Sequence, residues 1–285
     1  MSSTRSRVAL GLVVLGFAVL YWQVLAKLVM DWYHDDNYSH GFLIVPIAAY
    51  FAWERRDKLK ATAVNGSVFG LVVVLGSIAV LLAGILGSEL FLTRISIIGA
   101  LVGSVLFMLG WRQLRILAFP LAFLLLMIPI PAIIFNQIAF PLQLLASRFG
   151  ETAMAMADVP VLREGNVLIL ANTTLEVAEA CSGIRSLVSL LTLAIVLGYF
   201  SDRRLWVRLA VALSSIPVAV ITNGFRVAGT GIAAHRFGAA AAEGFFHEFS
   251  GWLVFVAAFA LTLAIQRAIV LIVPEAQPAP VPASV

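Results

Sequence analysis

Long apolar runs separated by short polar stretches dominate the sequence. Eight segments approach the roughly 20 mostly apolar residues that a membrane-spanning helix needs. They are 8–30, 39–53, 67–87, 92–111, 114–131, 184–200, 206–223 and 250–272. A further apolar segment, 132–149, follows Pro131 and contains Pro141, and is a ninth span, a re-entrant piece or an interfacial helix. The pattern predicts an all-α polytopic membrane protein with about eight transmembrane helices.

Basic residues gather at alternate connections between these segments, near residues 5–7, 54–60, 112–115 and 203–208. Cytoplasmic loops carry an excess of Lys and Arg. We therefore expect both termini in the cytoplasm, and the connections 31–38, 88–91, 132–183 and 224–249 on the opposite side. In a bacterium this is a multi-pass protein of the inner (plasma) membrane.

The longest polar stretch on the outer side, about 150–183, contains an alternating pattern. Two short β-branched runs, 159–163 and 167–170, flank a turn at 164–166, and a third alternating piece follows at 175–177. Short runs of this kind joined by a Gly/Asn turn indicate strands. We expect a small extracytoplasmic β-hairpin segment that leads into the helix carrying the cysteine.

Composition supports a membrane protein and limits the other classes. Hydrophobic residues make up 61% of the chain and charged residues 12%, about half of the charged fraction of a soluble domain. The net charge of +4 does not indicate a nucleic-acid partner, because the basic residues follow the topology. We expect one membrane domain over 1–273 and a disordered, Pro/Ala-rich cytoplasmic tail over 274–285.

One cysteine stands in the most informative motif. Cys181 is the only cysteine, which rules out an internal disulfide, and it follows Glu179 and precedes Ser182 and Arg185. At the start of the sixth span, the helix N-terminus and the arginine favour a thiolate. The alternative is an inert, packed thiol, since free cysteine is among the most buried residue types.

Two further polar clusters fall on the outer side. Asn223 and Arg226, at the end of the seventh span, share a helical face. His247 and Glu248 open the eighth span, and Gly251 one turn later permits a close approach. A histidine suits proton transfer near neutral pH. The alternatives are an arginine that snorkels to lipid headgroups and a histidine that faces them.

The remaining histidines carry weaker signals. His40 belongs to the polar island 32–41, whose two histidines and two aspartates lack the spacing of a zinc site. We expect it to support the fold or bind substrate, and we expect no metal and no cofactor. His235, beside Arg236, is interpreted as part of a solvated loop.

A cysteine, an arginine and a histidine on one membrane face are the components of a thiol transpeptidase. The motifs Glu-Ala-Cys-Ser-Gly-Ile-Arg at 179–185, Asn-x-x-Arg at 223–226 and His-Glu-x-x-Gly at 247–251 resemble the exosortase/archaeosortase family. Tyr-Ser-His-Gly at 38–41, the basic end at 53–56 and the segments 129–131 and 142–143 also resemble it. The resemblance covers nearly the whole chain.

The resemblance implies a membrane cysteine transpeptidase that cleaves C-terminal sorting signals of exported proteins, each with a Pro-Glu-Pro-like motif, a membrane helix and a basic end. Such proteins often accompany exopolysaccharide and biofilm genes. It makes Cys181 the nucleophile, Arg226 the substrate or oxyanion stabiliser and His247 the general acid. The supporting positions are Glu179, Ser182, Arg185, Asn223, Glu248 and His40.

Other classes fit parts of the pattern. A membrane protease that releases its product to water shares the acyl-enzyme step with a transpeptidase. A non-enzymatic transporter or assembly factor for exopolysaccharide export predicts polar residues along several spans, whereas here they gather at one end. A lipid-linked acyltransferase would not require the cysteine. The predicted partners are the bilayer, a membrane-anchored protein substrate and an unidentified acceptor. We expect Cys181, Arg226 and His247 to converge, with the segment 159–177 beside them.

Overall fold

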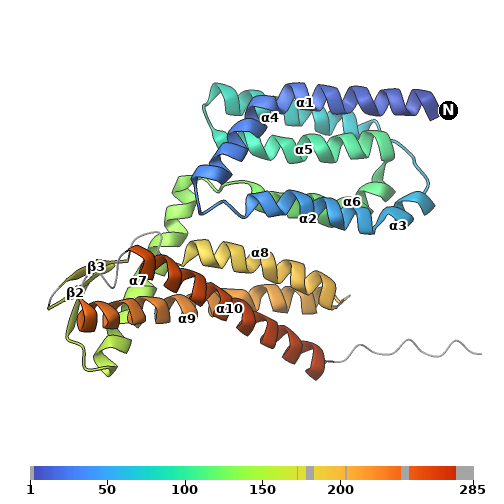
Figure 1. Cartoon of the computed structure of the whole chain (residues 1–285). Coiled ribbons are helices and arrows are strands. Elements are labelled where there is room, and N and C mark those ends of the chain that lie inside the picture. Colours follow the sequence, from blue (N-terminus) through green and yellow to red (C-terminus); the bar gives the residue numbers. More distant parts are fainter. Residues whose placement is uncertain (1–2, 172, 178–182, 203, 239–243, 274–285) are drawn as a thin grey trace, which may run out of the picture. The chain divides into compact units, whose positions relative to one another are not determined.

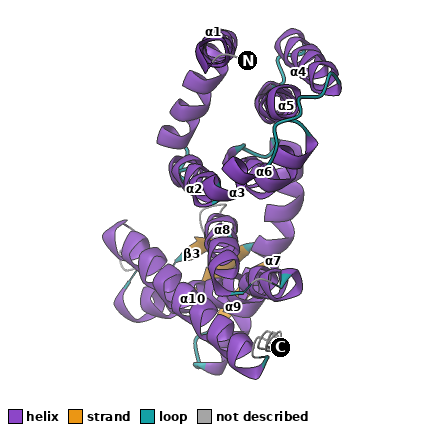
Figure 2. Cartoon of the chain, turned by 90° about the vertical axis from the view of Figure 1, so that its right-hand side faces the viewer, coloured by secondary structure: helices purple, strands orange, loops and turns teal. Residues whose placement is uncertain are grey.

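The computed structural model describes residues 3–171, 173–177, 183–202, 204–238 and 244–273. The chain divides into two compact units, Met1–Ile134 and Phe135–Val285, and each has its own apolar core. Helices make up most of the described chain, and its strands belong to one small sheet in the second unit (Figure 2). The expected domain over 1–273 stays a prediction, and the expected tail lies outside the described residues.

The first unit is a set of antiparallel helices around a core that includes Tyr21, Leu81 and Ile97. Glycines let two of these helices come close, because a Cβ on Gly103 would lie 2.8 Å from the backbone nitrogen of Val74. Small residues serve this purpose in membrane helix pairs. The elements are α1 (Ser3–His34), α2 (Gly41–Glu54), α3 (Arg56–Ala61), α4 (Phe69–Leu86), α5 (Leu90–Leu109), α6 (Trp111–Phe123) and the 3-10 helix η1 (Leu124–Met127).

The second unit combines three long helices, a further helix and a sheet (Figure 1). Helices α8 (Ile184–Ser201), α9 (Leu205–Phe237) and α10 (Gly244–Ile272) pack around Leu190, Val218 and Ala258. Helix α7 (Ala132–Met156) precedes them, with all but its first three residues in this unit. The strands β1 (Val161–Glu164), β2 (Val167–Leu170) and β3 (Thr174–Glu176) form an antiparallel sheet in the order β1-β2-β3.

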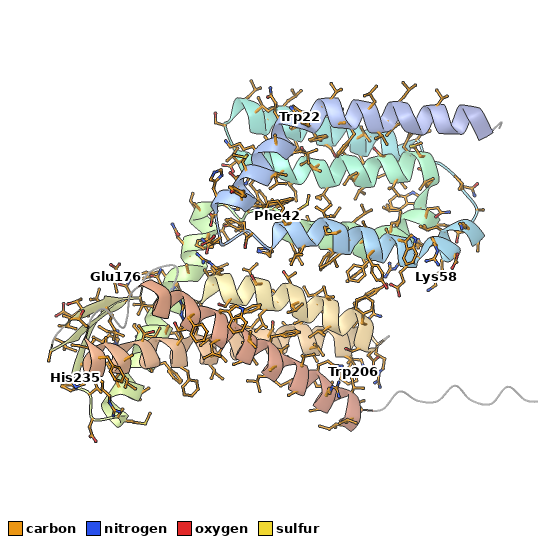
Figure 3. The ribbon with its side chains drawn as sticks, viewed as in Figure 1. Trp22, Phe42, Lys58, Glu176, Trp206 and His235 are labelled. Atoms are coloured by element: carbon orange, nitrogen blue, oxygen red, sulfur yellow. The ribbon has the colours of Figure 1, made fainter. Side chains whose placement is uncertain are left out.

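The sheet is fixed to the end of α9 that carries His235, opposite the end that carries Trp206 (Figure 3). Its buried residue Leu168 shares a core with Met154 of α7 and Val227 of α9. The hydroxyl of Ser147 in α7 donates to the carbonyl oxygen of Gly165 in the β1–β2 turn, at 3.0 Å. The predicted hairpin segment is therefore confirmed, and its third alternating piece is a strand of the same sheet.

The predicted spans agree with the helices except in a few places. Six described helices are long and apolar enough to cross a membrane, or seven if α6 to α7 forms one broken span. The predicted count of eight is thus approximate. Helices α1, α7, α9 and α10 are longer than the predicted segments, and α9 by the most, since it continues for fourteen residues beyond 223. The prediction of a loop at His235 was wrong, since this residue lies in the last turn of α9.

Candidate functional site

The structure describes the predicted site residues to different extents. Glu179, Cys181 and Ser182 lie outside the described residues. The backbone of His247 and Glu248 belongs to the first turns of α10, but their side chains are not described. The side chains of Arg185, Asn223, Arg226 and His40 are described.

Asn223 and Arg226 lie within α9, three residues apart and therefore on one face of the helix. The side chain of Asn223 is buried, Arg226 is half-buried, and the Nε atom of Arg226 is inaccessible to solvent. Between them, Gly224 faces α7, where a Cβ would lie 2.6 Å from Cγ of Phe149. The buried Nε atom of Arg226 disfavours the alternative of an arginine whose guanidinium snorkels to headgroups.

The described part of the cysteine motif contacts Asn223. Gly183 precedes α8 with a φ of +78°, a left-handed conformation that glycine adopts without strain. A Cβ on Gly183 would lie 2.7 Å from Cγ and 3.0 Å from Nδ2 of Asn223. The α8 helix thus begins directly against the α9 face that carries Asn223. Arg185, in the first turn of α8, is half-buried.

The described part of the histidine motif contacts Arg226. A Cβ on Gly251 would lie 3.1 Å from an Nη atom and 3.3 Å from Cζ of Arg226. The guanidinium therefore lies on the α10 backbone at Gly251. Residues four apart share a helical face, so His247 occupies the same face of α10 as Gly251, one turn earlier.

The α9 helix is accordingly the element where the motifs meet. Its polar face touches the segment after Cys181 through Asn223 and the segment after His247 through Arg226. The neighbouring α9 residue Val227 packs in the core below the sheet. Whether the three reacting side chains converge, and whether the sheet borders them, stay predictions.

His40 belongs to the first unit, where it lies in the connection between α1 and α2. Its Nε2 lies 3.2 Å from the carbonyl oxygen of Leu126. Nearby, Trp32 Nε1 donates to the carbonyl oxygen of Met127 at 2.9 Å. Burial lowers the pKa of His40, an effect opposed by its hydrogen bond to the backbone oxygen of Leu126. These contacts join the end of α1 and the start of α2 to η1, and the expectation that His40 supports the fold or binds substrate stays a prediction.

Two structural contributors were not recognised in the sequence. The cysteine motif gives Gly183 no role of its own, and this glycine allows α8 to start against Asn223. Its place directly before a helix was the available signal. Ser147, which holds the sheet to α7, lies in an apolar run where a serine gives no indication of its partner.

The comparisons with known proteins agree with these motifs. The sequence profile of the transmembrane exosortase family (Exosortase_EpsH) matches residues 32–264, which is more than four fifths of the chain and includes all three motifs. Neither the curated proteins nor the solved structures compared with the chain gave a significant match. With its series of apolar helices, the chain is a multi-pass membrane protein and belongs to the transmembrane exosortase family.

Proposed function

We propose that the protein is a membrane-embedded cysteine peptidase or transpeptidase that cleaves C-terminal sorting signals of exported proteins. The observation that carries the proposal is the double contact of α9. Asn223 touches Gly183, two residues after Cys181, and Arg226 touches Gly251, one turn after His247. Two residues of extended chain span at most about 7 Å. Covalent geometry therefore limits how far the thiol can be from this face of α9.

The proposed reaction divides into two steps. The Cys181 thiolate attacks the scissile carbonyl carbon, and a C–S bond forms while the carbonyl oxygen becomes an oxyanion. The Arg226 guanidinium stabilises this charge, and its packing against α10 at Gly251 favours the preorganisation that such stabilisation requires. The C–N bond then breaks, and the leaving amine takes a proton from His247. A thioester to the substrate remains.

The second step regenerates the thiol. A nucleophile on the acceptor attacks the thioester carbon, its proton goes to the neutral imidazole of His247, and the C–S bond breaks. Water in place of the acceptor gives a free carboxylate, so the same groups perform hydrolysis or transfer. In this proposal the reaction takes place on the extracytoplasmic side of a bacterial inner membrane. The substrate is membrane-anchored, with a Pro-Glu-Pro-like motif, a membrane helix and a basic end.

Processing of a tagged reporter that carries such a tail tests the proposal. The reporter is co-expressed with the wild-type chain, with Cys181→Ala, or with Ser189→Ala as a matched control in α8. We expect wild type and Ser189→Ala to remove the tail and Cys181→Ala to leave it intact. The product mass distinguishes a free carboxylate from an attached acceptor. Equal processing with Cys181→Ala would exclude the thiol mechanism.

A second measurement tests the thiol directly and needs no substrate. Because Cys181 is the only cysteine, alkylation of the intact protein reports on this residue alone. We expect a membrane-impermeant maleimide added to the outer side to label it, with a rate that exceeds that of an ordinary exposed thiol at pH 7. Labelling only after the membrane is permeabilised would contradict the proposal that Cys181 faces the outer side.

A further inference from the structure

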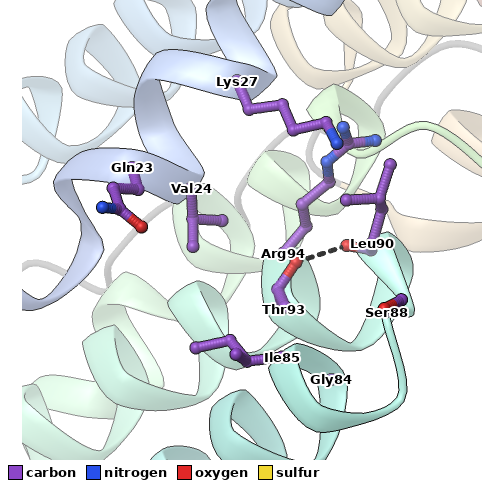
Figure 4. A pocket seen from close by; sticks show the side chains of 9 residues that line it. All are labelled: Gln23, Val24, Lys27, Gly84, Ile85, Ser88, Leu90, Thr93 and Arg94. Atoms are coloured by element: carbon purple, nitrogen blue, oxygen red, sulfur yellow. Dashed lines mark hydrogen bonds between the residues drawn. The ribbon is translucent and has the colours of Figure 1, made fainter.

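A cavity of about 340 Å³ in the first unit lies apart from every residue assigned to the reaction. It opens between the last turns of α1 and α4 and the first turns of α5 (Figure 4). Both polar and apolar side chains line it, and two of them are cationic. The lining residues are Gln23, Val24, Lys27, Gly84, Ile85, Ser88, Leu90, Thr93 and Arg94.

The charges around this cavity do not balance. Arg94 is almost fully buried, with 4% of its surface exposed, and forms an ion pair with Asp31 of α1. One carboxylate thus compensates one buried guanidinium. Lys27 adds a second cation that makes no hydrogen bond or ion pair within the described part of the chain. Its side chain extends toward the guanidinium of Arg94 (Figure 4).

The carboxylate of Glu89, which lies between the lining residues Ser88 and Leu90, is already engaged. Glu89 is exposed, and its side chain accepts a hydrogen bond from the backbone nitrogen of Phe91 at the start of α5. It does not line the cavity. Two cations that converge on a cavity with one carboxylate repel each other, and an anion between them relieves this repulsion. The cavity therefore has the electrostatics of an anion site.

The position of the cations indicates the source of the anion. Lys27 lies seven residues before the end of α1, roughly 10 Å along the axis, and Arg94 lies four residues after the start of α5, roughly 6 Å. Headgroup regions are about 5–8 Å thick on each side of the hydrocarbon core. Long Lys and Arg side chains near the end of a spanning helix reach back to the interface, so cations within about two turns of these helix ends can meet a lipid phosphate. The walls formed by Val24, Ile85 and Leu90 suit an adjoining apolar chain.

We propose that this cavity binds the phosphate group of an anionic membrane lipid. Lys27 and Arg94 contact the phosphate as charge-assisted donors, and Ser88 supplies a hydroxyl. Thr93 is not a donor here, because its hydroxyl already donates to the carbonyl oxygen of Leu90 at 2.8 Å. The bound headgroup bridges α1 to the α4–α5 pair. The site is independent of the proposed transpeptidase activity.

Lipid binding by the full-length protein in phosphatidylcholine nanodiscs tests the proposal. Phosphatidylglycerol is titrated in, and binding is followed by native mass spectrometry and by the unfolding temperature, which rises when a ligand binds only the folded state. We expect Lys27→Gln to weaken phosphatidylglycerol binding roughly fivefold. Lys27→Arg, which keeps the charge, restores it. Lys58→Gln, which removes an exposed lysine of α3, is the matched control and leaves binding unchanged.

Three further measurements separate the alternatives. Lys27 is exposed, so Lys27→Gln in pure phosphatidylcholine keeps the wild-type unfolding temperature. Ser88→Ala changes a different wall of the cavity, and we expect it to weaken lipid binding by less than Lys27→Gln does. Inorganic phosphate is titrated in place of the lipid. Equal affinity of wild type and Lys27→Gln for phosphatidylglycerol overturns the proposal. So does Lys27-dependent binding of inorganic phosphate without any preference for phosphatidylglycerol over phosphatidylcholine.

Discussion

Gly183 packs directly against the side chain of Asn223, so the helix that follows the cysteine motif begins on the polar face of α9. A Cβ on Gly183 would lie 2.7 Å from Cγ of Asn223, closer than real Cβ atoms approach, and φ at this glycine is +78°. Two independent features, the left-handed backbone and the close contact, therefore require glycine here. Substitutions can measure separately how much the left-handed backbone and the close contact each contribute.

Replacement of Gly183 by alanine should abolish processing of the sorting-signal reporter and lower the unfolding temperature. The added Cβ must displace Asn223 or the start of α8, in addition to left-handed strain of about 1 kcal/mol. Gly165→Ala is the matched control, because Gly165 also has a positive φ, +66°, but a Cβ there would meet nothing within 4 Å. We expect Gly165→Ala to lower the unfolding temperature only by the amount that the backbone strain causes, and to retain processing. Equal losses in the two variants would mean that the contact with Asn223 is unimportant.

The contact between Gly251 and Arg226 predicts a different outcome. A Cβ at 3.1 Å from the guanidinium is tight but tolerable if the side chain moves by a few tenths of an ångström. Because alanine favours helix over glycine by up to about 1 kcal/mol, Gly251→Ala should not lower the unfolding temperature. In the proposed mechanism Arg226 is an oxyanion donor, which acts mainly in the transition state, so reporter turnover should fall about tenfold, mostly in kcat.

Gly229→Ala is the control for this substitution. It introduces the same change in a long helix of the same unit, at a position in α9 where a Cβ would meet nothing within 4 Å. We expect wild-type turnover from it. A Gly251→Ala variant with wild-type kcat would show that the position of Arg226 on α10 does not matter to the reaction.

The sequence predicted the helices well where lipid dictates composition. The ends of α4, α5, α8 and α10 fall within a few residues of the apolar runs, apart from the start of α10, because a spanning helix must be apolar over about 20 residues. The predicted span 206–223 ends before α9 does, because the hydropathy of the sequence drops at 223. A helix does not have to end where the membrane does, and the part beyond 223 is stabilised by protein contacts such as Gly231 against Met154.

The sequence predicts which residue types form the candidate site, but not how they pack together. Periodicity assigns Asn223 and Arg226 to one face of a helix, but it does not reveal which segment packs on that face. The partners, Gly183 and Gly251, have no side chains and therefore no pattern of their own. His40 shows the same limit, since its contact with Leu126, 86 residues away, has no counterpart in the local sequence.

Arg226→Lys tests whether shape or charge matters at this position. Lysine keeps the positive charge but loses the planar, multidentate fork that can hold an oxyanion against α10. We expect reporter turnover to fall about a hundredfold, the scale of losing one oxyanion donor. The alkylation rate of Cys181 should stay near the wild-type value, because the thiol itself is not changed. Arg236→Lys, in the exposed last turn of the same helix, is the control.

Full turnover in Arg226→Lys would show that a positive charge at this position is sufficient and that the shape of the guanidinium is not needed. A parallel loss in Arg236→Lys would indicate an effect of the bilayer or of solubility. The expected pattern, a loss at 226 and none at 236, would separate a positioned guanidinium from a surface charge.

The half-buried position of His40 predicts a pH dependence of stability in the first unit. Burial lowers the pKa of this histidine below its ordinary 6.5, so the folded chain binds the proton less tightly than the unfolded chain. The contribution to stability is complete above pH 6.5 and is lost as the pH falls from there through the lowered pKa. His40→Gln, which keeps an amide donor for the carbonyl oxygen of Leu126, should flatten the fall of unfolding temperature between pH 7 and pH 5. His34→Gln, at the exposed end of α1, should leave that fall as in wild type. An unchanged pH dependence in His40→Gln would show that protonation of His40 does not cause the loss of stability at acidic pH.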